Sequence, residues 1–327
     1  MKISVGVDVS KDTLDVAFVG KNIAQRSFSN SEWGIGSLLK IISEQVETEI
    51  VVTMEATGVY HLNLAVHLLE AGLTVSVVNP LIIKRYGEMK MLRAKTDPVD
   101  ARMIADYGYN QEPILFVPKP RKCQQIVGFL NVIEDYLGIK TQNTNRLESL
   151  QFQPERQIEI IDSIKRINGQ IDREIKVIEK MIHEVLIENN KDAYNHVMSI
   201  PGIGKRTASA MIGYFNHFEN FETAKQVSSY IGINPSPYSS GSSVRGRGSI
   251  SKKGNGYLRK LLYMAALSAS RSNEQCRNLH KRLLAQGKCK KVILIAIANK
   301  LLRQIFAIIK YKREYSSNYE PIFSKVD

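Results

Sequence analysis

The sequence is poor in cysteine, and its few cysteines are far apart. Only three are present among 327 residues, Cys123, Cys276 and Cys289, and no two of them form a Cys-x-x-Cys pair. This spacing argues against a disulfide framework and a zinc site, and it fits a reducing cytosol. The first residues run straight into a strand-like pattern, which predicts that no signal peptide is present. We therefore expect a cytoplasmic protein.

Long uninterrupted apolar runs are also missing. The most apolar late stretch, Val292 to Ile309, is broken by Lys300 and Arg303. A membrane-spanning helix needs about 20 predominantly apolar residues. We interpret this stretch as a buried or amphipathic helix, and with no lipidation motif we expect no membrane partner.

Acidic residues are scarce in the C-terminal part of the chain. From Ser243 to Arg313 there are 18 Lys and Arg residues but a single acid, Glu274. Residues 1–110 hold 11 basic and 13 acidic side chains, so the net charge of +13 comes from the remainder. Such asymmetry predicts a C-terminal part that binds a polyanion.

The N-terminal part has the pattern of an α/β domain. Apolar runs at 3–9, 14–19 and 22–27 with short links predict a meander of antiparallel strands. Helical spacing over 31–46 and 58–71 then alternates with strand-like runs that begin at Glu49 and Thr74. This order predicts a mixed sheet covered by helices.

The rest of the chain is predicted to be mainly helical. Isoleucines recur at steps of three and four residues from Ile158 to Ile182, which is typical of a long antiparallel or dimeric coiled coil. A further helix is expected over residues 218–231. We predict an α/β domain at 1–118, a coiled-coil linker at 119–195 and a helical domain at 196–327.

Residues 199–208 resemble the hairpin of a helix-hairpin-helix DNA-binding unit. Gly202 and Gly204 would let the backbone approach a phosphate, and the N–H groups that open the next helix would face it beside Lys205 and Arg206. A plain helix–turn–helix connection explains the same residues.

A loop rich in serine and glycine, residues 239–243, runs directly into the basic segment. Such runs are usually flexible linkers. Here, however, the serines are followed by Arg245 and Arg247, and this order suggests a hydroxyl presented to a polyanion.

Four carboxylates in the N-terminal part are placed where they can converge. Asp8 and Glu55 each end a predicted strand, and Asp97 and Asp100 share one face of a helix start. Oxygen ligands of this kind suit Mg²⁺ and two-metal phosphoryl chemistry. Helix capping explains Asp97 and Asp100 equally well. Asp12 and Asp15, which we leave out, are just as near in sequence to the first strand.

These motifs, taken together, resemble a known family. The segments 6–11, 55–58 and 95–101 look like the D-E-D-D signature of a RuvC-like, RNase H-type domain. With the distal segments 201–204, 232–235, 239–241 and 250–259, they resemble the DEDD transposases of the IS110 insertion-sequence family, relatives of the Piv-type DNA invertases.

The resemblance implies a site-specific DNA recombinase of a bacterium or archaeon, associated with the nucleoid. Its partners would be donor DNA, target DNA and a structured bridge RNA, with a homodimer assembling to a homotetramer. The four acids would be catalytic residues that hold Mg²⁺, with Mn²⁺ as the alternative ion. The family's serine precedes the glycine, which selects Ser240 as the nucleophile among Ser239, Ser240, Ser242 and Ser243.

Basic residues near these motifs would bind nucleic acid, and some would stabilise the charge that develops at the phosphorus. We expect this role for seven side chains: Lys205, Arg206, Arg245, Arg247, Lys252, Lys253 and Arg259.

Three other functions remain open. An RNase H-like, structure-specific endonuclease would use water as the nucleophile with the same acids. A Piv-like invertase would act on fixed sites without guide RNA. A non-catalytic nucleic-acid-binding protein would not need all four acids.

Overall fold

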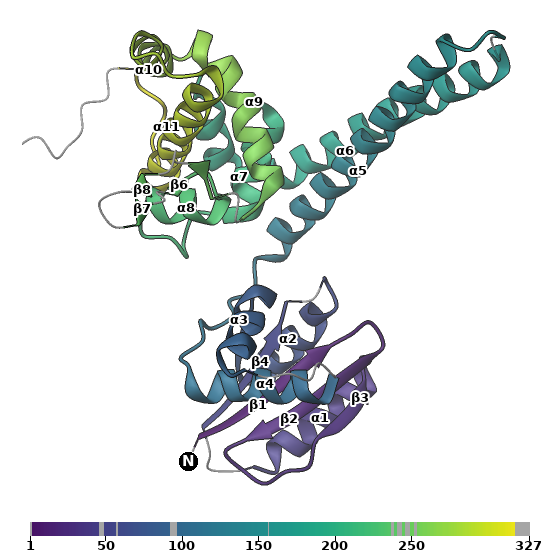
Figure 1. The fold of residues 1–327 in the computed structure, drawn as a ribbon, viewed down its shortest axis with the longest axis vertical. Coiled ribbons are helices and arrows are strands. Elements are labelled where there is room, and N and C mark those ends of the chain that lie inside the picture. Colours follow the sequence, from purple (N-terminus) through teal and green to yellow (C-terminus); the bar gives the residue numbers. More distant parts are fainter. Residues whose placement is uncertain are drawn as a thin grey trace, which may run out of the picture. The chain divides into compact units, whose positions relative to one another are not determined.

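The computed structural model describes residues 2–45, 49–56, 58–91, 97–155, 157–236, 239–240, 244–245, 249–251 and 254–317. For residues 97–98, 236, 239–240, 244–245 and 249 it describes the backbone alone. The chain divides into two compact units, Met1–Pro118 and Lys119–Asp327 (Figure 1).

The first unit contains a mixed five-stranded sheet in the order β3-β2-β1-β4-β5. The first three strands are antiparallel, and β4 and β5 run parallel to β1. The predicted meander and mixed sheet are confirmed, although the third strand lies a few residues later than expected. The strands are β1 (Lys2–Val9), β2 (Thr13–Val19), β3 (Arg26–Ser29), β4 (Glu49–Glu55) and β5 (Thr74–Val78).

One face of this sheet holds the main apolar core of the unit. Alternate residues of β1, from Ile3 to Val9, enter it together with Leu38 of α1 and Leu64 of α2. The helices of the unit are α1 (Glu32–Ser43), α2 (His61–Glu70), α3 (Pro80–Met89) and α4 (Asp97–Asn110). Helix α1 begins where Ser31 accepts a hydrogen bond from the Gly34 N–H.

Helix α4 covers the opposite face of the sheet at unusually short range. A Cβ atom on Gly6 of β1 would lie 2.2 Å from the backbone nitrogen of Ala105 and 2.3 Å from the carbonyl oxygen of Ala101. At Gly108 the side chains of Ser4 and Thr53 are equally close. Glycine at these two positions is what allows α4 to lie directly on β1 and β4.

The second unit is mainly helical, as predicted. Its helices are α5 (Arg121–Gln151), α6 (Ile158–Met198), α7 (Lys205–Phe215), α8 (Ala224–Ile231), α9 (Gly256–Ser272), α10 (Glu274–Ala285) and α11 (Lys290–Tyr311). Four two-residue strands lie between α8 and α9: β6 (Pro235–Ser236), β7 (Ser239–Ser240), β8 (Val244–Arg245) and β9 (Ser249–Ile250).

Helices α5 and α6 form an antiparallel pair within one chain (Figure 1). Three polar contacts join them: Lys122 to Glu188, Lys140 to Asp172, and Asn143 to Asn168. Residues later in α5 contact residues earlier in α6, so the two helices run antiparallel.

Only part of the isoleucine stripe on α6 is buried in this pair. Ile171, Ile175 and Ile182 lie in the core, whereas Ile158 and Ile167 have 62% and 50% of their surface exposed.

The helix predicted over residues 218–231 is shorter than expected. The structure begins α8 at Ala224, because Thr223 and Gln226 form a reciprocal capping box. Phe218, which the prediction placed in this helix, is fully buried and has a φ of 56°. That left-handed backbone is incompatible with a continuing helix.

Helix α11 is the one helix among the described residues that is long and apolar enough to cross a membrane by length and composition. In the structure Ile297, Leu301 and Ile305 are completely buried among the other helices of the second unit. Its role as a core helix accounts for its apolar composition.

Candidate active site

Asp8 and Glu55 lie side by side at the ends of two neighbouring parallel strands. Val7 pairs with Met54 in the parallel register, so Asp8 and Glu55 are the next residues on strands about 4.8 Å apart. Val7 and Met54 both point into the core. Because side chains alternate along a strand, Asp8 and Glu55 therefore point to the face that α4 covers. Both are half-buried there.

The start of α4 lies level with these two carboxylates. Gly108 of α4 lies against Ser4 of β1, and Ala105 and Ala101 lie against Gly6. Helix α4 therefore runs in the direction opposite to β1. A strand rises about 3.3 Å per residue and a helix about 1.5 Å. Two residues further along β1, at Asp8, the helix has therefore reached its first turn.

Asp97 and Asp100 belong to this first turn of α4. Asp100 is half-buried, and the side chain of Asp97 lies outside the described part of the structure, as does the capping role predicted for it. The packing of α4 on β1 thus brings the backbone positions of all four predicted acids to one edge of the sheet.

The donor set at this edge suits a hard divalent cation. Carboxylate oxygens are the ligands that Mg²⁺ and Mn²⁺ accept, and such sites commonly keep several waters. Within the described residues, no three His, Cys, Asp or Glu side chains already form a ready-made ligand cluster. Asp8, Glu55 and Asp100 would hold the ion together with Asp97.

Asp15 is an acid near this site that the sequence interpretation left out. It is the direct partner of Asp8 across the antiparallel β1–β2 ladder and is half-buried. Its neighbour along β2, Leu14, enters the main core, so Asp15 points to the same face as Asp8. The alternation of β2 could have revealed it, but the pairing register could not be read from the sequence.

A polar contact between α3 and α4 holds the acid-bearing helix in place. The Tyr86 hydroxyl donates a 2.8 Å hydrogen bond to Asp106, and Lys90 lies 3.2 Å from the same carboxylate. Burial alone would raise the pKa of Asp106, but the hydrogen bonds from Tyr86, Lys90 and Asn110 hold that pKa below its usual value.

The backbone around the predicted serine forms two short antiparallel ladders, β6–β9 and β7–β8, here together called the ribbon. Its base pairs Pro235 with Ile250, and further out Ser240 pairs with Val244. Three residues, 241–243, connect these last partners and lie outside the described residues, as do Arg247, Lys252 and Lys253. Ser240 therefore stands at the last backbone pair before the tip of the ribbon.

The base of the ribbon is fixed by a buried polar network. Asn234 accepts a 2.5 Å hydrogen bond from the Ser228 hydroxyl, and Asn299 of α11 donates to the same hydroxyl at 2.9 Å. Ser251, which follows β9, donates its N–H to the Asn234 carbonyl. These contacts tie the β6–β9 end of the ribbon to α8 and α11.

Comparison with known proteins matches both the acid-bearing unit and the segment that carries the predicted serine. Residues 5–150 match the DEDD transposase model of the IS110 group, and residues 194–281 match the model described as Transposase IS116/IS110/IS902 family. A pilin gene-inverting protein of Moraxella bovis is 30% identical over an alignment of 323 positions, which covers 96% of this chain and 98% of that protein. The chain belongs to the IS110 transposase family. The predicted family resemblance is confirmed.

Other relatives are more distant. A 43.6 kDa protein of insertion element IS110 from Streptomyces coelicolor is 22% identical, with 96% of each chain covered. Among solved structures, RuvC of T. thermophilus in complex with a Holliday junction has a TM-score of 0.28 at 14% identity, covering 36% of this chain and 100% of that one. Membership of the IS110 transposase family makes this protein an enzyme of DNA recombination.

The basic residues predicted to bind nucleic acid differ in their surroundings. Lys205 is exposed at the start of α7. Arg206 forms a 2.7 Å ion pair with Glu179 of α6, and Arg259 donates a 2.8 Å hydrogen bond to the Ile231 carbonyl. Arg245 lies in β8, opposite Ser239 in the ladder. Since a guanidinium has five N–H donors, the two engaged arginines retain donors for a phosphate.

Gly202 packs closely against α9 in this transposase. Its φ is +96°, and an added Cβ would lie 2.6 Å from the Cα of Ala269 on α9. The neighbouring helix therefore occupies the space that a side chain at this position would need. Gly204 faces open space and is the N-cap of α7.

Proposed function

We propose that this transposase cuts and rejoins DNA through a covalent phosphoserine intermediate, guided by a bridge RNA. The observation that carries the proposal is the place of Ser240 at the last pair of an anchored ribbon. The acidic edge of the sheet alone would serve a water-using nuclease equally well. A serine presented by a built element, rather than by a free linker, favours the covalent route.

The acidic edge would hold Mg²⁺, with Mn²⁺ as the alternative. A cation bound there would neutralise charge on the scissile phosphate. The chain's own part is to place Asp8, Glu55, Asp97 and Asp100 at one level by laying α4 against β1.

In the cleavage step the Ser240 oxygen forms a bond to phosphorus as the bond from phosphorus to a deoxyribose oxygen breaks. The serine proton ends on the departing deoxyribose hydroxyl, so no water is consumed. The phosphoserine ester retains the energy of the broken bond, and attack by another DNA hydroxyl reverses the step and reseals a strand. Arg245, Arg247 and Lys252 would stabilise charge on the phosphoryl oxygens.

We infer that the active form is a dimer that assembles to a tetramer on donor and target DNA. Support comes from apolar side chains that the α5–α6 pair leaves exposed, including Ile139, Ile167 and Val177 at 44%, 50% and 49%. Burying them against a second copy would be favourable. In such an assembly one chain would supply the acids and its partner the serine. The enzyme would work on cytoplasmic DNA at the nucleoid.

The test is an assay for a covalent protein–DNA adduct. Purified protein is mixed with Mg²⁺, the RNA transcribed beside its gene, and labelled donor and target DNA, then denatured and separated on a gel. We expect a protein-linked DNA band for wild type that is lost in Ser240→Ala and in Asp8→Ala. Ser239→Ala, in the same two-residue strand, is the matched control and should retain the band.

Two outcomes would contradict the proposal. DNA cleavage without any adduct, lost in Asp8→Ala but kept in Ser240→Ala, would establish a water-using nuclease. An adduct that survives in Ser240→Ala and disappears in Ser239→Ala would move the nucleophile by one residue.

A second candidate is a DNA invertase that works at fixed sites without RNA. The 30% identity to the pilin gene-inverting protein over nearly the whole chain favours it. Omitting the RNA from the same assay separates the two: the guided recombinase would lose its adduct, whereas the invertase would form it unchanged.

A further inference from the structure

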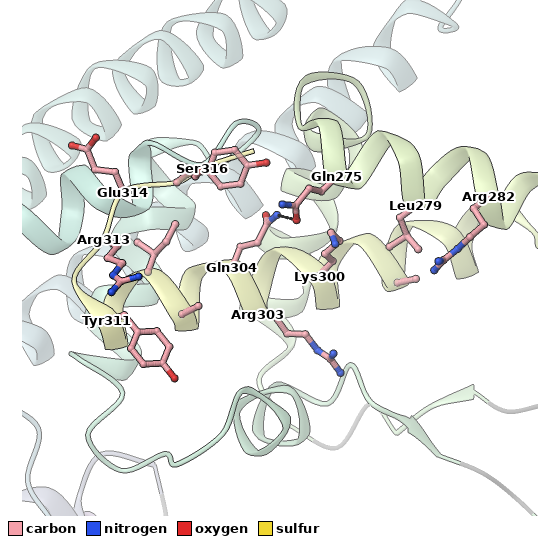
Figure 2. A pocket seen from close by; sticks show the side chains of 14 residues that line it. Gln275, Leu279, Arg282, Lys300, Arg303, Gln304, Tyr311, Arg313, Glu314 and Ser316 are labelled. Atoms are coloured by element: carbon pink, nitrogen blue, oxygen red, sulfur yellow. Dashed lines mark hydrogen bonds between the residues drawn. The ribbon is translucent and has the colours of Figure 1, made fainter. Parts of the chain in front are cut away.

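A pocket of about 570 Å³ lies in the helical unit between α10, α11 and the segment that follows α11 (Figure 2). Its volume is within the range of about 300–1,000 Å³ that is common for pockets that bind one small ligand. None of the residues assigned above to the acids, the serine ribbon or the α7 turn lines it.

The rim of this pocket is strongly basic. It includes Arg282, Lys300, Arg303 and Arg313, with Glu314 as the single acid. Figure 2 shows Arg282, Arg303 and Arg313 at different borders of the pocket. Within the described residues, none of the four cations has a carboxylate within 4.0 Å. Four basic side chains without an acidic partner complement an anion.

The interior of the pocket is apolar, with a small polar group at its centre. Leu279, Ala296 and Ile308 contribute apolar surface, and Tyr311 is 59% exposed. The amides of Gln275 and Gln304 face each other, and Gln304 donates to Gln275 at 3.1 Å.

The two amides are held in place but not saturated. Gln275 also donates to the Ser317 carbonyl, and Gln304 also accepts from Asn273. Each amide has two N–H donors and two lone pairs on its oxygen. Gln304 also contacts the Tyr315 hydroxyl and so keeps only an acceptor site, whereas Gln275 keeps one donor and one acceptor for a ligand, the pattern that hydrogen-bonds the edge of a nucleobase.

The segment that closes the pocket is anchored at Tyr315. Its N–H donates to the Ser199 hydroxyl at 2.9 Å, and its own hydroxyl donates to Asn273 at 3.2 Å. The wall that carries Arg313 is thereby attached to α10 and to the end of α6. The pocket is a built feature of the helical unit rather than a gap beside a loose tail.

We propose that this pocket binds one unpaired nucleotide of a nucleic-acid strand. The base lies on the apolar floor and stacks on Tyr311, its polar edge meets Gln275 and Gln304, and the flanking phosphates lie on the basic rim. Stacking on an aromatic ring combined with a basic track is the usual way in which proteins hold single strands. A base inside a duplex is stacked on its neighbours and could not enter the pocket.

The unpaired nucleotide could belong to an opened DNA strand or to an RNA loop. The site rests on the proposed function only in that the enzyme must handle separated strands. The test detects nucleotide binding in the pocket directly. Binding can therefore be absent in a protein that forms the covalent adduct, and it can be present in a protein that forms none.

The experiment is photocrosslinking of the full chain to short strands that carry 5-iodouracil. One arm uses DNA, a second uses RNA of the same sequence, and a third uses the DNA duplex. We expect a crosslink at Tyr311, mapped by mass spectrometry, with single strands and not with the duplex. The arm with the greater yield identifies the source of the nucleotide. Absence of any crosslink in this pocket, or equal yield from the duplex, would overturn the proposal.

Affinity measurements with matched variants provide the second readout. Arg303→Glu should weaken single-strand binding about tenfold, whereas Lys290→Glu, on the same helix but outside the pocket, should change it less than about twofold. Tyr311→Leu should lose the crosslink and Tyr311→Phe should keep stacking affinity. Equal losses for Arg303→Glu and Lys290→Glu would show diffuse electrostatic attraction and overturn the site.

Removal of residues 318–327 tests whether the chain itself fills the pocket. A crosslink of similar yield in the shortened protein supports the nucleotide site. A crosslink that forms only after the removal would assign the pocket to the chain's own tail in the full-length protein.

Discussion

At the scale of single residues, the most informative contact is the cross-strand pair of Asp8 and Asp15. Residues directly opposite in an antiparallel ladder have Cβ atoms about 4.5–5.5 Å apart, and like charges there are destabilising. Glu55 adds a third carboxylate on the next strand. A divalent cation would relieve this repulsion, so the same residues that weaken the sheet favour a bound metal.

Asp15→Asn should therefore weaken binding of the metal without abolishing it. Removing one nearby negative charge should raise the dissociation constant for Mn²⁺ about fivefold, as measured by calorimetry on the purified protein. Asp8→Asn should have a much larger effect and abolish cleavage. Asp12→Asn, at an exposed position of the β1–β2 turn, is the control. A metal affinity unchanged in Asp15→Asn would show that Asp15 lies outside the metal's field.

The sequence was sufficient to nominate the four acids because each ends a strand or starts a helix. It could not nominate Asp15, since that requires the register of β1 on β2. It also could not show that Arg206 and Arg259 already contact Glu179 and the Ile231 carbonyl. Such partners are 27 and 28 residues away in the chain, and only tertiary packing selects them.

At the scale of elements, the site depends on how closely α4 lies on β1. Gly6→Ala would place a methyl group within 2.3 Å of two backbone atoms of α4. We expect a loss of about 2–3 kcal/mol of unfolding free energy, typical of overpacking, together with loss of DNA cleavage. Denaturant unfolding followed by circular dichroism measures the first effect, and the adduct assay measures the second.

Gly36→Ala on α1 is the matched control for this change, because an added Cβ there meets nothing within 4 Å. It should leave cleavage unchanged and stabilise the helix by up to about 1 kcal/mol. If Gly6→Ala were as stable and active as wild type, the close packing of α4 would not be what positions the acids.

The link between α3 and α4 should make this unit sensitive to acid. The pKa of Asp106 is lower in the folded protein than in the unfolded chain, so its contribution is present at neutral pH. That contribution is lost as the pH falls through the ordinary carboxyl range toward the folded pKa. Asp106→Asn should cost about 1–2 kcal/mol at pH 7 and flatten the loss of stability between pH 5 and about pH 3.

Thermal melts across this pH range test the Asp106 prediction. Glu70→Gln, an exposed acid at the end of α2, should follow the wild-type curve. If the melting temperatures of Asp106→Asn and wild type fell in parallel with pH, another carboxylate would be responsible for the acid sensitivity.

Element types were easier to predict than their ends. Periodicity located the strands of the sheet and the long helices, because apolar spacing reports which face is buried. The start of α8 was misplaced because the left-handed backbone at Phe218 has no signal in an ordinary apolar residue. The sequence predicts only a loop at 239–243, because two-residue ladders such as β7–β8 are too short to show alternation.

At the scale of the whole molecule, the acids and the serine belong to two separately packed units. If the active site combines acids of one chain with the serine of another, a mixture of Asp8→Ala and Ser240→Ala proteins should recover adduct formation that neither shows alone. The mixed dimer would contain one intact site. The adduct assay on co-refolded chains measures this recovery, and its complete absence would place both halves of the site in the same chain.

The uneven charge of the chain predicts strong salt dependence of nucleic-acid binding. Residues 111–327 carry a net charge of +15, so binding should release many counterions. The logarithm of the affinity should fall linearly with the logarithm of salt concentration. Arg303→Glu should reduce the slope of this line by about one or two units, whereas substitutions of the four acids should leave it unchanged.

The contact of Gly6 with α4 also limits how the enzyme can change over generations. Because Gly6 has no room even for a methyl group, every substitution there would disturb α4. Successive mutations at this position therefore cannot change the placement of the acid-bearing helix gradually. Variation should instead accumulate where an added side chain meets open space, as at Gly204 on α7. A laboratory search for altered DNA preference should begin at such permissive positions of the helical unit and keep the interface of β1 and α4 constant.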